Sequence, residues 1–222
     1  MQRNKNQSIY FFYIIFWLVW LLVQSFLSPY LEHSVTFHSS YDLIINFVLK
    51  GIIWVGLTFI LWSSFKQKLQ FTPQKIFNKH FSKEFWIFLA IFIIYLSANA
   101  YSVNPNFKFV SNPLSVNGGQ IWGMVIGAGM FEELVFRAGF MNILLKKHSF
   151  WVTNIIQSLL FLAIHFPVYF ITKMTSFDVV DNFATVIILG LVFGYVFYKT
   201  KNLWTTIILH AVWDSMMFFL FV

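Results

Sequence analysis

Long apolar runs recur along this chain of 222 residues and are separated by short polar connections. Seven of them approach or exceed the length of about 20 mostly apolar residues that a helix needs to cross a bilayer core of about 30 Å. These runs cover residues 9–28, 42–63, 85–101, 119–145, 151–170, 183–199 and 203–222. Inside a bilayer the chain must satisfy its own backbone polar groups, which a helix does locally. The pattern therefore predicts an all-α, polytopic membrane bundle of about seven transmembrane helices.

The composition agrees with a membrane protein and excludes several other classes. Hydrophobic residues make up 59% of the chain and charged residues 10%, whereas soluble domains average roughly 45–50% and about 25%. A soluble enzyme, a nucleic-acid-binding domain and a disordered chain are therefore excluded, and the lipid bilayer is the expected surrounding. The chain has no Cys, so it can form neither a disulfide framework nor a thiolate zinc site. We expect one integral membrane domain over residues 1–222, without internal repeats.

The basic residues predict how the bundle is oriented. The apolar run 9–26 is longer than a signal-peptide core of about 7–15 residues, and no Ala-x-Ala-like cleavage site follows it, so we expect a retained helix. If the N-terminus is cytoplasmic, the outer segments hold only Lys108 and Lys173. The inner segments then hold eleven basic residues, namely Arg3, Lys5, Lys66, Lys68, Lys75, Lys79, Lys83, Lys146, Lys147, Lys199 and Lys201. Because Lys and Arg concentrate in cytoplasmic loops, this distribution predicts a cytoplasmic N-terminus and an outer C-terminus.

Six ionisable residues fall inside three of the last four predicted helices, where charge is costly. A charged side chain near the bilayer centre costs at least about 2.5–3.5 kcal/mol on insertion scales, so such residues usually face a bundle interior or a cavity. The six residues are Glu132, Glu133, Arg137, His165, His210 and Asp214. Asp42 and Lys50 also lie near or within the second predicted helix.

Helical spacing sorts these residues onto faces. Glu133 and Arg137 are four residues apart, so they share a face and can form an ion pair. Glu132 points about 100° away from Glu133 and is free to face another partner. His210 and Asp214 are also four residues apart on one helix. The depths of these residues are compatible, so a shared polar cavity that opens toward the cytoplasm is geometrically possible.

Such a set of side chains suits acyl hydrolysis without a covalent nucleophile. A partly desolvated carboxylate beside an imidazole can hold and deprotonate a water near neutral pH. A second imidazole and another polar side chain can donate hydrogen bonds to a developing oxyanion. Ser158 and Ser215 lack the surroundings of a nucleophile elbow, and no His-Glu-x-x-His zinc motif is present. Taken alone, Glu133 with Arg137 is equally well explained as a structural ion pair.

Three motifs resemble those of the CPBP family of intramembrane proteases, named for CAAX-protease and bacteriocin-processing members and also called Abi. They are Glu-Glu-x-x-x-Arg at 132–137, Phe-x-x-x-His at 161–165 and His-x-x-x-Asp at 210–214. The stretch 190–194 and the basic turn 199–204 also look like that family. The resemblance covers roughly residues 119–216, whereas residues 1–118 match only in being helical and apolar.

The resemblance implies a glutamate-dependent intramembrane endopeptidase that needs no metal and no other cofactor. By position, Glu132 would activate the attacking water with His165 as its partner, and Arg137 would hold Glu133. The family also includes bacterial proteins linked to bacteriocin immunity and to the processing of peptide signals. The implied partner is therefore a membrane-associated peptide or protein substrate.

One position departs from the pattern. His210 and Asp214 would line the oxyanion side, but the last position of the third motif is commonly Asn in CAAX-type members of the family. An Asn can donate a hydrogen bond to an oxyanion, and an ionised Asp cannot. Three interpretations stay open. Asp214 is protonated and donates, or it orients His210 from one turn away, or it joins Glu132, Glu133, His165 and His210 as a ligand of a divalent ion.

Two other functions compete with the peptidase. A non-catalytic membrane protein of the same fold, acting in bacteriocin immunity or peptide binding, would tolerate Glu132→Gln. A proton-coupled transporter is disfavoured because the chain lacks paired repeats with broken helices. Gly190 and Gly194 predict a close helix contact rather than chemistry. The short loops and the composition rich in Phe, Ile, Asn and Lys favour a bacterial plasma membrane protein.

Overall fold

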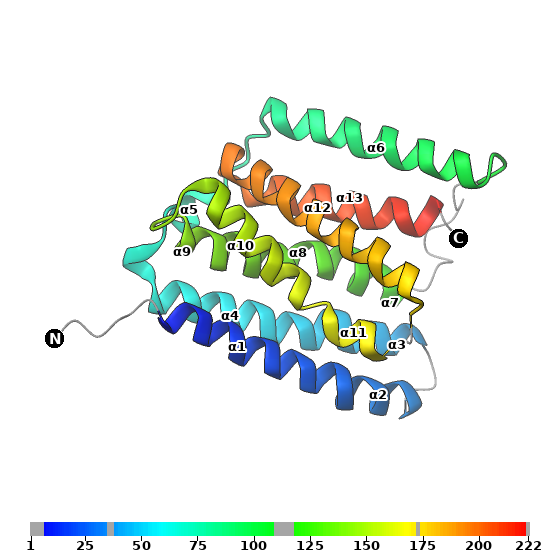
Figure 1. The fold of residues 1–222 in the computed structure, drawn as a ribbon, viewed down its shortest axis with the longest axis horizontal. Helices are drawn as coiled ribbons and strands as arrows, with labels where there is room; N and C mark the ends of the chain where they lie inside the picture. The colour runs from blue at the N-terminus through cyan, green and yellow to red at the C-terminus, as the bar shows by residue number, and fades with distance from the viewer. Residues whose placement is uncertain (1–6, 35–37, 109–117, 172–173, 221–222) are drawn as a thin grey trace.

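The computed structural model describes residues 7–34, 38–108, 118–171 and 174–220. This part of the chain is helical and contains no strand, and the long helices lie side by side along one direction (Figure 1). Seven long helical segments occupy the places of the seven predicted apolar runs. The predicted all-α polytopic bundle is therefore confirmed.

Several segments combine shorter helices that follow one another without a loop. In chain order the helices are α1 (Gln7–Leu22), α2 (Ser28–Ser34), α3 (His38–Asp42), α4 (Lys50–Ser64), α5 (Pro73–Ile76), α6 (Lys83–Val103), α7 (Gly118–Gln120), α8 (Ala128–Glu133), α9 (Asn142–Leu144), α10 (Phe150–Ala163), α11 (Phe166–Ile171), α12 (Ser176–Thr200) and α13 (Leu203–Leu220). Wider π-type turns join α1 to α2, α3 to α4, and α7 through α8 to α9. The stretch from α7 to α9 is thus one continuous helical segment.

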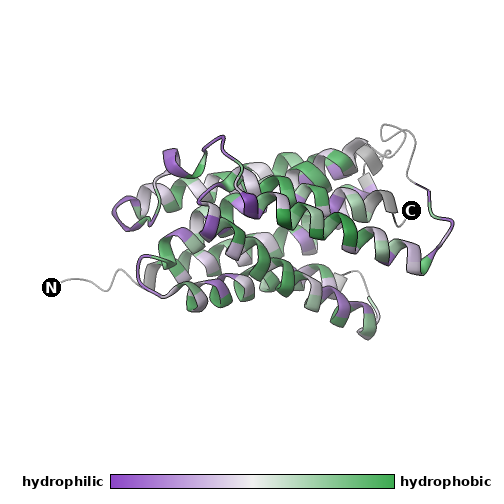
Figure 2. Cartoon of the chain, turned by 90° about the horizontal axis from the view of Figure 1, so that it is seen from above, coloured by the Kyte–Doolittle hydropathy of each residue, from purple (hydrophilic) through white to green (hydrophobic). Residues whose placement is uncertain are grey.

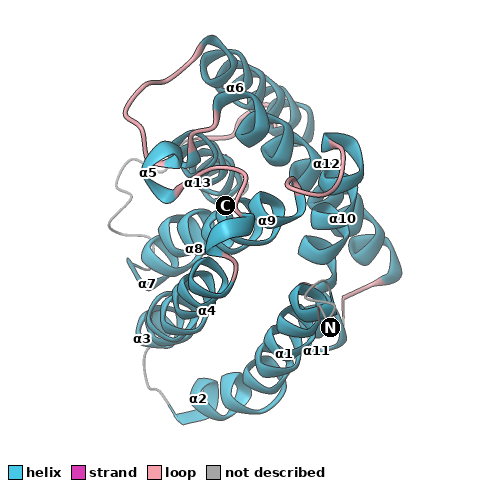
Figure 3. Cartoon of the chain, turned by 90° about the vertical axis from the view of Figure 1, so that its left-hand side faces the viewer, coloured by secondary structure: helices cyan, strands magenta, loops and turns pink. Residues whose placement is uncertain are grey.

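Five of the seven segments are long and apolar enough to cross a membrane by length and composition alone. They are Ile9–His33, Ser40–Ser64, Lys83–Val103, Phe150–Tyr169 and Ser176–Thr200. The α7–α9 segment and α13 are the two others, and both carry ionisable residues. The α7–α9 segment lies between α4, α10 and α13 (Figure 3), and most of its residues after Met130 are buried. Protein rather than lipid therefore surrounds much of this helix.

The outside of the bundle is apolar along the helices. Phe11, Ile52 and Ile94 are 60%, 68% and 69% exposed. Most hydrophilic residues gather in the connections at the two ends, whereas the helical faces are largely hydrophobic (Figure 2). Large exposed apolar areas are unusual on soluble monomers, so this surface is suited to lipid.

Two glycines of α12 allow α10 to approach closely. A Cβ at Gly190 would lie 3.0 Å from Ser158 Oγ, and one at Gly194 would lie 2.7 Å from Gln157 Nε2. The shared contact is polar: Gln157 Nε2 donates to the carbonyl oxygen of Gly190 at 2.9 Å, and Asn154 Nδ2 donates to that of Leu191 at 3.0 Å. The predicted small-residue contact is confirmed.

The fifth predicted helix is broken between α10 and α11, at Ile164 and His165. Pro167 lies in the first turn of α11 and lacks the N–H that would bond to Ala163. Its ring also crowds the carbonyl of that preceding turn. The break therefore has a local cause, and it sets His165 outside regular helix.

The two ends of the bundle differ in charge. We call the end that holds residues 65–82, 145–149 and 200–202 the basic end. Hydrogen bonds join these connections there: Asn202 Nδ2 donates to the carbonyl of His80 at 2.8 Å, and Asn78 Nδ2 to that of Lys201 at 3.3 Å. Residues 28–34, 38–46, 104–108, 118–124, 166–171 and 174–182 lie at the opposite end (Figure 1).

Candidate active site

Glu132, in the last turn of α8, lies inside the bundle and is paired with a cation from α4. Its Oε1 is 2.5 Å from Lys50 Nζ, and each of the two side chains is 8% exposed. The ammonium also lies 4.6 Å from the centroid of the Trp54 ring, a geometry in which the ring face attracts a cation. A buried ion pair thus joins residues that are 82 positions apart.

Glu133 contacts different partners from Glu132, in agreement with the predicted angle of about 100° between the two side chains. Its Oε1 is 3.0 Å from Arg137 Nη1 and 3.0 Å from His210 Nδ1. Arg137 Nη2 donates to the carbonyl oxygen of Gly190 at 3.2 Å. The guanidinium lies 4.9 Å from the centroid of Phe161. The predicted Glu133–Arg137 ion pair is confirmed, and it connects α8 with α10, α12 and α13.

His210 presents its second nitrogen to the other carboxylates. A carboxylate only accepts hydrogen bonds, so Nδ1 of His210 carries the hydrogen that it shares with Glu133. Its Nε2 lies 3.5 Å from Asp214 Oδ2 and 3.9 Å from Glu132 Oε2. The ring stacks on Phe193 at a centroid distance of 4.9 Å, which fixes its plane.

His165 is fixed by the carbonyl of Phe161, one turn earlier. Its Nδ1 is 2.8 Å from that oxygen, and since a carbonyl only accepts, Nδ1 is the donor. In the neutral ring Nε2 then carries no hydrogen and is available as a base. The Phe161–His165 spacing therefore sets the tautomer of this histidine.

A cavity of about 660 Å³ brings these groups together. Glu132, Lys50, His165, His210 and Asp214 line it. Glu133 and Arg137 lie behind this lining. The volume is within the range of about 300–1,000 Å³ that is typical of ligand pockets.

The cavity does not extend toward the basic end. In α8, α10 and α13 its lining residues stop at Glu132, Phe161 and His210, and the others lie toward the opposite end. If the N-terminus is cytoplasmic, as predicted, the basic end of the bundle faces the cytoplasm. The cavity then does not open toward the cytoplasm, an opening that the sequence had left possible. The buried side chains on the basic side of Glu132 explain why: Val135 and Phe136 are both 0% exposed.

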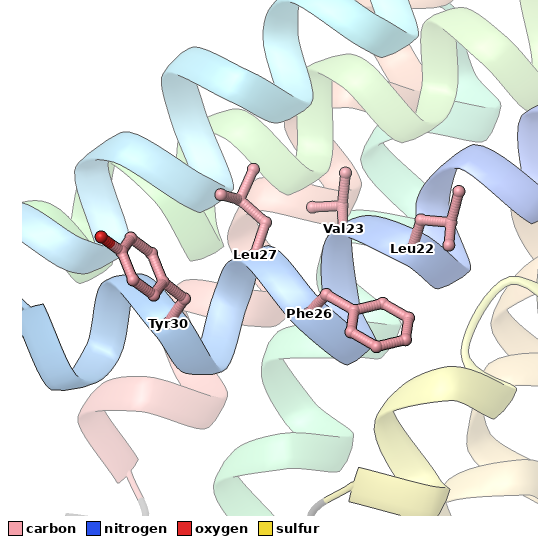
Figure 4. Close-up of a pocket in the computed structure, with 5 residues that line it drawn as sticks. All are labelled: Leu22, Val23, Phe26, Leu27 and Tyr30. Atoms are coloured by element: carbon pink, nitrogen blue, oxygen red, sulfur yellow. The ribbon is translucent and has the colours of Figure 1, made fainter.

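A second hollow lies on the outer face of the first helical segment and is a poor candidate for chemistry. Leu22, Val23, Phe26, Leu27 and Tyr30 line it (Figure 4). All five come from one segment, and none has a side chain that is charged at neutral pH. This hollow is best understood as part of the lipid-facing surface.

The two serines considered as nucleophiles are bonded to their own helices. Ser158 Oγ donates to the carbonyl of Asn154 at 2.8 Å, and Ser215 Oγ donates to that of Ala211 at 2.6 Å. Neither has a histidine among its hydrogen-bond partners. A serine mechanism therefore gains no support.

The metal interpretation of Asp214 also gains no support from the geometry. Within the described ranges, no group of three or more His, Asp or Glu side chains has the arrangement of a metal site. A Lys50 ammonium occupies the position beside Glu132 where a cation would be expected. Asp214 instead contacts His210, which agrees with the interpretation that it orients that ring.

Lys50 is the site residue that sequence reasoning missed. The sequence placed it in the second helix but gave it no role. A lysine inside a predicted membrane helix is costly unless it has a partner. Glu132 also lacked an assigned cation, since Arg137 was matched to Glu133. Together, these two observations could have indicated a Lys50–Glu132 pair from the sequence alone.

Comparison with known proteins gives one match. Residues 116–216 match the family model described as type II CAAX prenyl endopeptidase Rce1-like. No curated protein and no solved structure matches the chain. The matched range contains Glu132, Glu133, Arg137, His165, His210 and Asp214, and Lys50 lies outside it.

Proposed function

We propose, from the match of residues 116–216 to the Rce1-like CAAX protease family model, that the chain is an intramembrane endopeptidase that uses Glu132 as its general base. The observation that carries the proposal is the difference between the two neighbouring glutamates. Glu133 is held by Arg137 and His210, whereas Glu132 lines the cavity beside two imidazoles. This difference supports Glu132, rather than Glu133, as the carboxylate that meets a substrate.

In this mechanism Glu132 accepts a proton from a water whose oxygen attacks the carbonyl carbon of the scissile bond. The proton then passes to the amide nitrogen as the carbon–nitrogen bond breaks, which yields a carboxyl and an amine end. His165 Nε2 lies on the same cavity and holds the water as a hydrogen-bond acceptor. No covalent intermediate with the protein is needed.

The developing oxyanion requires a donor near Glu132. Lys50 Nζ is such a donor, because it already contacts Glu132 and faces the cavity. His210 Nε2 donates only when the ring is doubly protonated, since Nδ1 carries the hydrogen shared with Glu133. We assign Asp214 the role of orienting His210, supported by their contact at 3.5 Å.

The substrate in this proposal is a peptide or protein held in the membrane. We place the chain in a bacterial plasma membrane on the basis of its composition, and a peptide precursor or a bacteriocin-related peptide is then the proposed target. The alternative, a non-catalytic binder of the same fold, gains nothing from a desolvated carboxylate that faces a cavity.

Cleavage of a library of membrane peptides by the purified chain tests the proposal, with products identified by mass spectrometry. Glu132→Gln is expected to abolish cleavage. Glu84→Gln is the matched control, because Glu84 lies at the basic end and contacts Ser82. Since Glu132→Gln leaves the Lys50 ammonium unpaired, the double variant Lys50→Gln/Glu132→Gln serves as a second inactive form. Retained cleavage in either Glu132 variant would refute the proposed base.

A further inference from the structure

We infer that the cavity opens on the non-cytoplasmic side of the membrane, so that its substrates are peptide segments that approach from that side. That the occupant of the cavity is a substrate rests on the proposed function. The direction of the opening follows from the fold and the distribution of charge. Three separate observations support the direction of the opening: the lining residues, the closed side of the cavity and the distribution of lysines.

The lining residues place the opening. Every helical segment that contributes to the cavity does so with the part of its length that runs toward the end opposite the basic end. Besides the catalytic groups, the lining includes Gln24, Ser28 and Glu32 of the first segment, Tyr41 and Asn46 of the second, Gly123 and Met124 of the fourth, and Asn182 and Thr185 of α12. Glu32 is exposed at this end, so the cavity reaches the surface there.

The other side of the site is closed by packed side chains. Phe71, Ile76, Met141, Phe197 and Leu203 form one cluster at the basic end, and four of them are 0% exposed. A pair of hydrogen bonds fastens the connection over this cluster: Asn142 Nδ2 donates to the carbonyl of Phe71 at 2.9 Å, and the amide of Phe71 donates to Asn142 Oδ1 at 2.8 Å. A peptide has no path through this packing without unfolding it.

The lysines identify which side of the membrane each end faces. Among residues 7–34, 38–108, 118–171 and 174–220, the basic end carries Lys66, Lys68, Lys75, Lys79, Lys83, Lys146, Lys147, Lys199 and Lys201. The opposite end carries Lys108. Because short cytoplasmic loops are enriched in Lys and Arg, the closed end faces the cytoplasm and the open end faces away from it.

The chemistry of the cavity narrows the substrate class. Aromatic side chains of Trp20, Trp54 and Trp213 line it together with amide and hydroxyl groups. A volume of about 660 Å³ admits an extended segment of a few residues and excludes a folded domain. The substrate is thus an unfolded segment of a translocated or membrane-anchored peptide.

The absence of Cys from the sequence makes a direct test possible. Four single-cysteine variants report on four places. Gln24→Cys and Thr185→Cys lie in the cavity, Asn106→Cys lies in the connection at the opposite end, and Ser149→Cys lies at the basic end. Intact cells and permeabilised cells are treated with a charged, membrane-impermeant maleimide, and the unaltered chain is the blank.

We expect Asn106→Cys, Gln24→Cys and Thr185→Cys to react in intact cells, and Ser149→Cys to react only after permeabilisation. The opposite pattern would overturn the inference, because the cavity would then face the cytoplasm. Reaction of Ser149→Cys and Asn106→Cys alike in intact cells would overturn it too, since the chain would have two orientations. Cavity cysteines that react only after denaturation would also overturn the inference, because the cavity would then be closed on both sides. None of these results depends on peptidase activity, so failure of the proposed function is detected separately by the Glu132 variants.

Discussion

The Lys50–Glu132 ion pair gives the most quantitative prediction, because it connects two helices through a single buried contact. Lys50→Met removes the ammonium that lies over the Trp54 ring, and the Glu132 carboxylate then lacks this partner. Glu132→Gln leaves the opposite charge unpaired. Removal of one partner of a buried pair typically costs about 3–5 kcal/mol, because the remaining charge stays desolvated.

The expected magnitude lies at the lower end of that range. Both side chains are 8% exposed and line the cavity, so water reaches the remaining charge and reduces the penalty. We expect each single variant to lower the free energy of unfolding by about 3 kcal/mol. At about 2–4 °C per kcal/mol for a chain of this size, that corresponds to a fall of about 6–12 °C in the thermal midpoint.

The double variant Lys50→Met/Glu132→Gln decides whether the loss comes from the pair. With both charges gone, neither helix carries an unpaired ion, so we expect the double variant to be more stable than either single one. The assay is thermal unfolding of the purified chain in one detergent, followed by tryptophan fluorescence and completed as a double-mutant cycle. If the two single losses were simply additive, the two charges would not interact, and the reasoning would be refuted.

Three further predictions concern packing and the histidines. Gly194→Val places a side chain against Asn154 and Gln157 and should lower the thermal midpoint by an amount equivalent to about 1–3 kcal/mol; Gly56→Val, whose added Cβ meets nothing within 4 Å, is the matched control and should change it far less. His165→Gln should keep the fold but lower turnover by about 10²–10⁴-fold, as expected when general-base catalysis by Glu132 loses the imidazole that holds its water; turnover within threefold of wild type would exclude His165 from the reaction. Asp214→Asn keeps a polar group beside His210 and should retain more activity than Asp214→Leu, measured as initial cleavage rates; equal loss in both would mean that the charge of Asp214, and not its contact with His210, is what matters.

Periodic features of the fold were predictable from the sequence. The apolar runs set the seven helical segments because bilayer thickness fixes their length. The Glu133–Arg137 pair followed from a spacing of four within one helix. Gly190 and Gly194 predicted a close helix contact for the same reason, since both lie on one face of α12.

Contacts between helices were harder to predict. The Lys50–Glu132 pair depends on how α4 and α8 are aligned, and no local spacing reports that alignment. One nitrogen of His210 bonds to Glu133, a residue 77 positions earlier, and no spacing within one helix indicates that contact. The end toward which the cavity opens likewise depends on packing between helices. The six helical segments that line it pack tightly toward the basic end and leave space toward the opposite end. The break at His165 had a local signal in Pro167, which the apolar run concealed.

The central claim is that Glu132 is the base of a peptide hydrolase, and one rate comparison tests it most directly. The initial rate of cleavage of a single identified peptide is measured for the wild-type chain, for Glu132→Gln, which keeps the Lys50 donor, and for Lys50→Gln/Glu132→Gln, in which no buried charge is left unpaired. We expect neither variant to show cleavage above background, and we expect the double variant to unfold near the wild-type midpoint. Cleavage by the folded double variant at a rate close to that of the wild type would contradict this claim.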